Sequence, residues 1–169
     1  DTTEADVELQ YTFELGTTEV MITVSDGENE PVSCTTSVTV EDTTPPVINK
    51  IRANPSTLWP PNHKMVEVDV RVDATDICGE TTARIVSVKS NEPVNDIGDG
   101  NTAPDWEITD DLEVELRAER SGRGDGRVYT LTVEVSDGSD NTASDTVKVR
   151  VPKSQGRSSR WGRSSRWRR

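Results

Sequence analysis

The sequence contains few of the residue types from which most catalytic and metal sites are built. It has one histidine and two cysteines, and aromatic residues make up only 4% of its 169 residues. Two cysteines, Cys34 and Cys78, are too few to define a disulfide framework. They are left as isolated thiols, or they pair with each other, with a partner chain or with a cysteine outside this sequence. No run of about 18 apolar residues is present, which excludes a membrane-spanning helix.

The composition is that of a soluble protein with a thin core. Hydrophobic residues make up 31% and charged residues 30%, and the net charge is −12. Val, Thr, Ile and Tyr dominate the patterned segments, as is typical of strands. A chain of this size accommodates one ordinary domain plus a fragment, or two small domains.

Alternation of apolar and polar residues indicates an all-β fold. Such a period of two predicts strands with one buried and one wet face, and strands at this spacing predict a β-sandwich. No stretch shows a convincing helical period. The alternating runs are Val7 to Phe13, Val20 to Val24, Val38 to Val40, Val66 to Val72, Ile85 to Val88, Leu112 to Leu116, Tyr129 to Val135 and Val147 to Val151.

The segment "EDTTPPVI", residues 41–48, marks the expected boundary between two domains. Its consecutive prolines, Pro45 and Pro46, stiffen the chain and cannot donate to a strand ladder. We therefore expect an incomplete sandwich over residues 1–45, a complete sandwich of about seven strands over residues 46–152, and a tail over residues 153–169.

An internal repeat supports this division. "VSDGENEPVSCTTSVTV" at residues 24–40 aligns without a gap with "VSDGSDNTASDTVKVRV" at residues 135–151, at an offset of 111 residues. Such a repeat marks tandem domains. Only three strands are expected before the prolines, at about residues 7–15, 18–24 and 32–40, so the first domain is expected to lack its earlier strands. Either the sequence starts late in a longer chain, or another subunit supplies the missing strands.

The exposed strand near the start is the expected contact between chains. On the second alternative, a neighbouring copy packs against the apolar positions of this strand and against one cysteine. The expected subunit contacts are Val7, Leu9, Tyr11, Phe13 and Cys34.

The C-terminal tail differs from the rest of the chain. "GRSSRW" occurs twice in succession and is followed by two more arginines. The tail holds six arginines and no acid, which leaves residues 1–156 with 13 basic and 31 acidic groups, a net charge of −18. Interleaved Arg and Trp suit an acidic protein surface or anionic lipid, while the acidic body disfavours nucleic acid; a disordered low-complexity end is the alternative. The tail residues concerned are Arg157, Arg160, Trp161, Arg163, Arg166, Trp167, Arg168 and Arg169.

Acidic clusters are the candidate metal ligands. Calcium prefers carboxylate and carbonyl oxygens from flexible loops, and it is the one cofactor that the sequence suggests. The candidates are Glu41, Asp42, Asp73 and Asp76 near the expected joint, and Asp96 and Asp99 in a loop rich in Gly and Asn. The loop lacks the spacing of an EF-hand, and solvated surface charge is the simpler interpretation.

Three further side chains, Trp59, Trp106 and His63, are candidates for binding or catalysis. Trp59 and Trp106 offer flat faces for sugar stacking, but packing is the simpler role in a chain short of large apolar groups. His63, in "WPPNHKM", lacks the signature of a catalytic serine nearby and suits a hydrogen-bonded turn.

Four longer segments resemble a known class of module. "PSTLWPPNHKMVEVDV" (residues 55–70), "ATDICG" (74–79), "SNEPVNDIGDGNTAPDWEI" (90–108) and "LRAERSGRGDGRVYTLTVEVSDGSDNTA" (116–143) resemble an immunoglobulin-like module of secreted bacterial proteins. "FELGTTEVMITVSDGENEPVSCTTSVTVEDTTPPVI" (13–48) is similar to the end of a polycystic-kidney-disease-like or hyalin-like repeat. The resemblance implies immunoglobulin-like sandwiches, export, and an adhesive, spacer or appendage role without catalysis. Related modules often carry a further cysteine near the position of Cys78, and this sequence has none there.

The sequence therefore predicts a non-enzymatic extracellular or cell-surface protein. Its expected role is a subunit of a surface fibre assembled by strand complementation, or the terminal piece of an adhesin. Its expected partners are other copies of itself or the upstream part of a longer chain. The alternative is an accessory ligand- or carbohydrate-binding module of a secreted hydrolase, with Trp59, Trp106 or the acidic loop as its site.

Overall fold

The computed structural model describes residues 10–94 and 102–154. Within these ranges the protein is all-β: it has nine strands and no helix, which confirms the predicted class. Accordingly, the described residues include no helix long and apolar enough to cross a bilayer. The strands are β1 (Gly16–Val24), β2 (Val32–Val40), β3 (Val47–Asn54), β4 (Met65–Thr75), β5 (Thr82–Ser90), β6 (Trp106–Asp110), β7 (Glu113–Arg117), β8 (Gly126–Ser136) and β9 (Thr142–Pro152).

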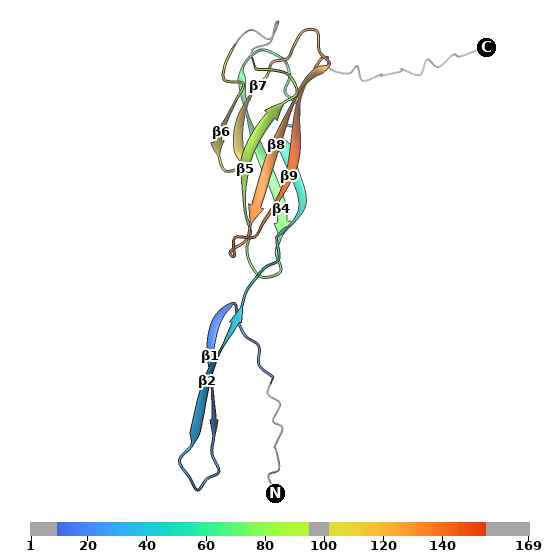
Figure 1. The fold of residues 1–169 in the computed structure, drawn as a ribbon. Helices are drawn as coiled ribbons and strands as arrows, with labels where there is room; N and C mark the ends of the chain where they lie inside the picture. The colour runs from blue at the N-terminus through green and yellow to red at the C-terminus, as the bar shows by residue number, and fades with distance from the viewer. Residues whose placement is uncertain (1–9, 95–101, 155–169) are drawn as a thin grey trace, which may run out of the picture.

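The strands form three antiparallel sheets. β1 and β2 make a hairpin, β3-β4-β7-β6 make a four-stranded sheet, and β5-β8-β9 make a three-stranded sheet. The two larger sheets face each other in a sandwich-like arrangement, which we call the two-sheet unit (residues 47–152). The hairpin projects from one end of this unit, beyond the segment that contains Pro45 and Pro46 (Figure 1).

The core lies between the two larger sheets. It forms because alternate residues of the strands point inward and exclude water. Its fully buried members include Val68 of β4, Val114 and Leu116 of β7, and Leu131 and Val133 of β8. The alternation read from the sequence therefore identified the correct inward faces for these strands.

Two of the expected features differ in the structure. Residues 10–15 form no strand up to a bend at Leu15, so the predicted first strand is wrong over its described part. The seven strands expected after the prolines are present, but two of them, β3 and β6, carry no clear alternation. β3 has a bulge between Ile48 and Lys50, and β6 is a short strand at the edge of its sheet, and both features weaken a period-two signal.

Candidate functional site

The N-terminal hairpin exposes an apolar face. Cross-strand partners point to the same side of a hairpin, and the register pairs Val24 with Val32 and Ile22 with Cys34. The side chains of this face are largely accessible, with Val24 at 68%, Val32 at 74% and Ile22 at 50%. We call this set the hairpin apolar face, and it comprises Val20, Ile22, Val24, Val32, Cys34 and Val38.

The opposite face of the hairpin is mostly polar. Thr17 and Thr39 are paired on it and share a side-chain hydrogen bond of 3.0 Å. Thr23 and Ser33 make a similar contact, also at 3.0 Å. The one large apolar side chain on this side is Met21. The hairpin is therefore amphipathic, although none of its residues is buried.

The hairpin of β8 and β9 has the same register as the hairpin of β1 and β2, but its apolar face is buried. Val24 pairs with Val32 in the first hairpin, and Val135 pairs with Ala143 in the second, so the two ladders share one register at the offset of the sequence repeat. Val135 is nevertheless fully buried. The first hairpin has the geometry of a core hairpin, and no sheet among the described residues covers it.

The expected subunit contacts fall in three groups. Val7 and Leu9 lie outside the described residues. Tyr11 and Phe13 are outside any strand and contact each other edge to face, with ring centroids 4.8 Å apart. Cys34 lies on the hairpin apolar face, and its thiol is free and exposed. Only the last of these residues belongs to the surface that the structure identifies.

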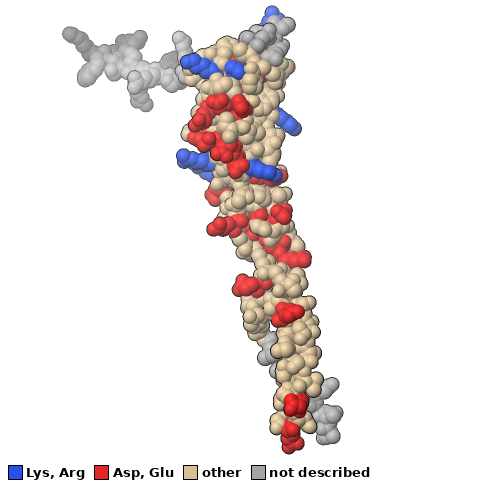
Figure 2. Space-filling view, turned by 90° about the vertical axis from the view of Figure 1, so that its left-hand side faces the viewer, with Lys and Arg blue, Asp and Glu red and all other residues tan. Residues whose placement is uncertain are grey.

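Charge is distributed unevenly along the molecule. Figure 2 shows acidic side chains on the slender part that contains the hairpin, and Lys and Arg only on the wider part. The sequence explains this, because its first basic residue is Lys50, at the fourth position of β3. The hairpin thus carries only negative charge.

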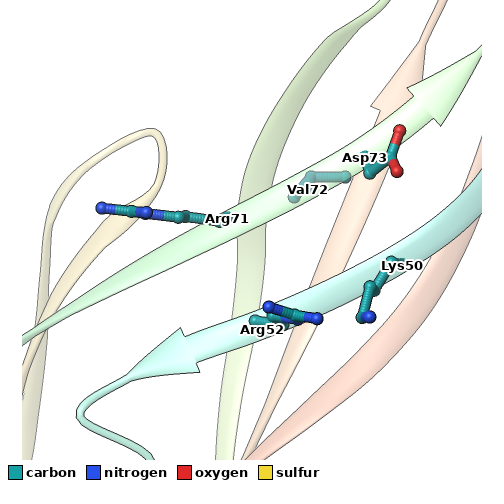
Figure 3. Close-up of a pocket in the computed structure, with 5 residues that line it drawn as sticks. All are labelled: Lys50, Arg52, Arg71, Val72 and Asp73. Carbon is teal, nitrogen blue, oxygen red and sulfur yellow. The ribbon is translucent and has the colours of Figure 1, made fainter.

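A basic patch lies on the outer face of β3 and β4. Lys50, Arg52 and Arg71 line a shallow hollow together with Val72 and Asp73 (Figure 3). Arg52 stands directly opposite Arg71 in the ladder, whereas Lys50 stands opposite Asp73. Like charges in directly opposite positions destabilise a sheet. We call Lys50, Arg52 and Arg71 the basic patch.

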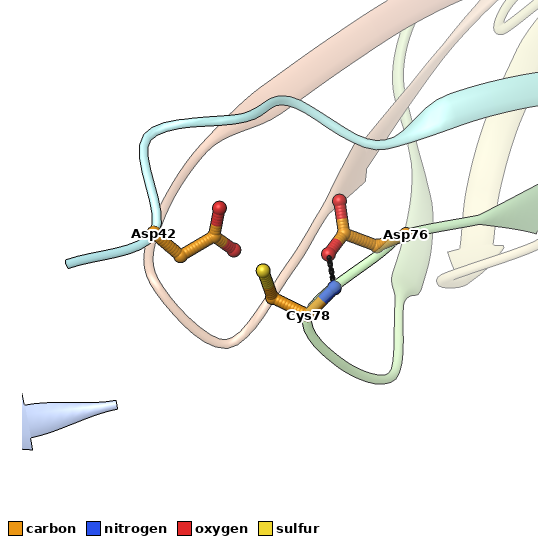
Figure 4. Close-up of side chains that lie close together, drawn as sticks. All are labelled: Asp42, Asp76 and Cys78. Atoms are coloured by element: carbon orange, nitrogen blue, oxygen red, sulfur yellow. Dashed lines mark hydrogen bonds between the residues drawn. The ribbon is translucent and has the colours of Figure 1, made fainter. Parts of the chain in front are cut away.

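The joint between the hairpin and the two-sheet unit brings Asp42, Asp76 and Cys78 together (Figure 4). One donor atom from each lies within 4.8 Å of the others. The backbone N–H of Cys78 donates to Asp76 Oδ1 at 2.7 Å. Asn141, in the turn after β8, donates from Nδ2 to the carbonyl oxygen of Asp42 at 3.1 Å. The hydrogen bond from Asn141 ties the linker to the turn after β8.

This group differs from the predicted calcium site. Asp42 and Asp76 converge as expected, but Asp73 lies in the hollow of the basic patch and Glu41 is exposed outside the group. Calcium takes six to eight oxygen ligands, whereas a thiol is a soft ligand. Two carboxylates and Cys78 are therefore a poor match for calcium. Asp96 and Asp99 lie outside the described residues.

Electrostatics at the joint follow from its acidic side chains. Partial desolvation of the sulfur, and then the negative charges of Asp42, Asp76 and Asp137, raise the pKa of the Cys78 thiol, although Cys78 is exposed. Burial alone would raise the pKa of Asp137, but hydrogen bonds from Asn141 and the backbone N–H of Ser139 outweigh it and lower that pKa. Asp137 therefore stays ionised and holds its turn in place.

The opposite end of the two-sheet unit contains a buried charged network that sequence analysis missed. Arg127 is fully buried, and its Nη1 donates to Asp105 Oδ2, to Glu119 Oε1 at 3.4 Å and to the Tyr129 hydroxyl at 3.2 Å. Its Nε donates to Glu92 Oε2 at 3.4 Å. Burial disfavours the charged guanidinium, but Tyr129 and Asp105 outweigh this effect, so the pKa of Arg127 is raised. Burial also raises the pKa of Tyr129, to about 12.

One signal in the sequence pointed to this network. The inward positions of β8 are Tyr129, Leu131, Val133 and Val135, and the same parity extended backwards reaches Arg127. A charged residue at an inward position must find partners. Its partners, Asp105, Glu119 and Glu92, come from segments between strands, where no periodicity applies.

His63 belongs to the rim of this network. Its Nδ1 lies 3.2 Å from Oε2 of Glu119, which also accepts a hydrogen bond of 2.9 Å from the Thr102 hydroxyl. The backbone of His63 has a φ of 63°, a left-handed conformation that is uncommon outside glycine. Among the described residues, no serine, threonine or cysteine side chain hydrogen-bonds to His63. These contacts join the loop of His63 to the network.

The two candidate tryptophans have different surroundings. Trp106 is partly buried against the core and meets Tyr129 edge to face, with ring centroids 6.3 Å apart. Trp59 is 40% exposed. A sugar-stacking face would therefore rest on Trp59 alone. The arginines and tryptophans of the tail lie outside the described residues.

No protein-family model, curated protein or solved structure significantly matches the chain. Functional interpretation therefore rests on the residues and contacts described above.

Proposed function

We propose that this chain is a non-enzymatic structural or adhesive protein of the cell surface or extracellular space, in which another copy covers the hairpin apolar face by strand complementation. The two-sheet unit is an immunoglobulin-like sandwich on this proposal, and the assembled form is a surface fibre. The single observation that carries the proposal is the hairpin of β1 and β2, which has the register of the buried β8 and β9 hairpin and yet is exposed.

The apolar face supplies the driving force for association. Fully burying a Val or Ile side chain stabilises a structure by about 1.5–3 kcal/mol relative to leaving it exposed. The face holds five such side chains, which are Val20, Ile22, Val24, Val32 and Val38, and none of them is buried. Covering most of this face would yield several kcal/mol, which is enough to offset part of the entropy lost on association.

The edges of the hairpin supply the specificity. Within the described part of the chain, β1 pairs only with β2, so each strand presents one unpaired edge of N–H and C=O groups. Such edges accept an added strand, and main-chain hydrogen bonds then fix its register. In the two-sheet unit, β5 pairs in this way with β8, the strand that corresponds to β1.

One observation favours the alternative function. Trp59 is an exposed aromatic side chain, and its flat face is available for stacking on a sugar ring. An accessory ligand-binding module of a secreted hydrolase would use this surface. Trp106 does not add a second aromatic side chain to this surface, because it packs against the core.

Sedimentation velocity over a range of protein concentrations tests the proposed assembly. We expect the full chain to form oligomers and Ile22→Asp to remain monomeric, because the substitution places a charge on the hairpin apolar face. Met21→Asp is the matched control, since Met21 is the adjacent residue on the opposite face and is 68% exposed. A wild-type chain that stays monomeric at every concentration, or equal association of the two variants, contradicts the proposal.

A further inference from the structure

The hairpin and the basic patch are electrostatic opposites within one chain. Residues 1–49 contain no Lys or Arg. The first two strands of the two-sheet unit carry three basic side chains, which are Lys50 and Arg52 on β3 and Arg71 on β4. None of the three forms an ion pair with any residue that the structure describes.

The tip of the hairpin is a rigid acidic turn. Asp26 Oδ1 accepts hydrogen bonds from the backbone N–H groups of Glu28 at 3.0 Å and Asn29 at 2.8 Å, and its Oδ2 accepts one from Asn29 Nδ2 at 2.7 Å. Gly27 has a φ of 79°, which this turn requires and which glycine adopts without strain. Glu28 and Glu30 complete the acidic set, and both are exposed. We call Asp26, Glu28 and Glu30 the acidic tip.

The basic patch has features that suit the binding of an acidic partner. Arg52 and Arg71 are directly opposite each other in the ladder, and neither forms an ion pair with a described residue, so an acidic partner would relieve their like charges. β3 is the edge strand of its sheet, because within the sheet it pairs with β4 alone, so the patch lies at one margin of the sheet. Together with Val72 and Asp73, these side chains line a shallow hollow (Figure 3).

We propose that the acidic tip of one copy docks on the basic patch of the next. The partner is thus a second copy of this chain, selected by charge complementarity, and the inference rests on the proposed assembly because it names its second contact. The hairpin projects from the two-sheet unit (Figure 1), so its tip is accessible to a neighbour. Charge pairs of this kind set the orientation of association and increase its rate.

A charge swap followed by sedimentation velocity tests this contact in the full chain. We expect Arg52→Glu with Arg71→Glu to weaken association by about tenfold or more in low salt, since the patch would then repel the tip. Glu28→Lys with Glu30→Lys has the same effect for the converse reason. The chain that carries all four substitutions regains association, a result that loss of folding cannot produce.

The matched control is Lys89→Glu with Arg123→Glu. These exposed residues lie on β5 and in the loop before β8, away from β3 and β4, and give the same change in net charge. We expect association of this control to stay within about twofold of the wild type. An equal loss in the control, or no rescue in the fourfold variant, overturns the proposed contact.

Two comparisons separate this inference from the proposed function. If Ile22→Asp abolishes association and the Arg52 and Arg71 variant does not, the docking contact is overturned while strand complementation stands. The reverse result upholds the docking contact and overturns strand complementation. If replacement of the tail arginines weakens association and neither the tip variant nor the patch variant does, the contact between tip and patch is overturned.

Discussion

The two hairpins of this chain have the same ladder and different environments. β1 and β2 repeat the register of β8 and β9, yet Val135 is fully buried while its counterpart Val24 is 68% exposed. Local pairing is therefore encoded within the hairpin itself. Burial comes from the opposing sheet, which the second hairpin has and the first lacks among the described residues.

The largest expected effect is a difference in stability when the same substitution is made at equivalent positions of the two hairpins. Val133 and Ile22 correspond in the repeat, but only Val133 is fully buried. Val133→Asp should destabilise the two-sheet unit by roughly 4 kcal/mol or more, because it buries an unpaired charge. Ile22→Asp should cost less than about 0.5 kcal/mol in the monomer. Urea unfolding followed by circular dichroism, at a concentration where both are monomeric, measures the difference.

Equal destabilisation by the two substitutions would contradict this expectation. It would mean that the hairpin is buried against the rest of the same chain, and the proposed partner surface would then be occupied within the monomer. Met21→Asp, on the polar face, controls for the effect of added charge on the hairpin.

The second prediction concerns a position where the two hairpins differ in sequence. Arg127 corresponds to Gly16, so only the second hairpin carries the buried network. Arg127→Met should destabilise the unit by roughly 3–5 kcal/mol, because Asp105 and Glu119 would lose their buried cation. Arg150→Met, at an exposed position on β9, should change stability by less than about 0.5 kcal/mol. Urea unfolding of both variants gives the values, and a similar small change in both would show that the network adds no stability.

The comparison also shows how far sequence reasoning reaches. Alternation identified the inward residues of β4, β7 and β8, and the sequence repeat identified two equivalent hairpins. The same alternation wrongly extended a strand to Tyr11 and Phe13, because a run of apolar residues forms a strand only when an edge is available to pair with it. Period two predicts which face of a strand is apolar, and it does not predict whether that face is covered.

The candidate sites were less accessible to sequence reasoning. Asp42 and Asp76 were expected at the joint, and the structure places them together, but it adds Cys78 and removes Asp73. The reason is geometric, since Asp73 is three residues before Asp76 and lies within β4, on the outer face of the sheet. The basic patch depends on cross-strand pairing of Arg52 with Arg71, and no linear pattern reveals that register.

The smallest expected effect concerns the pKa of an aspartate that both hairpins have in their turns, Asp26 in the first and Asp137 in the second. The side-chain hydrogen bond from Asn29, and then the backbone N–H groups, lower the pKa of Asp26 from 3.8 to about 2. The pKa of Asp137 is also lowered, since hydrogen bonds from Asn141 and Ser139 outweigh the effect of burial. Because both carboxylates are stabilised in the ionised form, each contributes to stability above its unfolded pKa. That contribution is lost as the pH falls through the folded value.

For Asp26 the loss should occur between pH 3.8 and about 2. An NMR titration of the two carboxyl carbons in the full chain measures both midpoints, which we expect below 3.8 for both residues. Asn29→Ala should raise the midpoint of Asp26 and leave that of Asp137 unchanged, because only the first turn loses its main donor. A midpoint for Asp26 at or above 3.8 in the wild type would show that the first turn is not formed in solution. The two hairpins would then share a sequence pattern and differ in local structure as well as in burial.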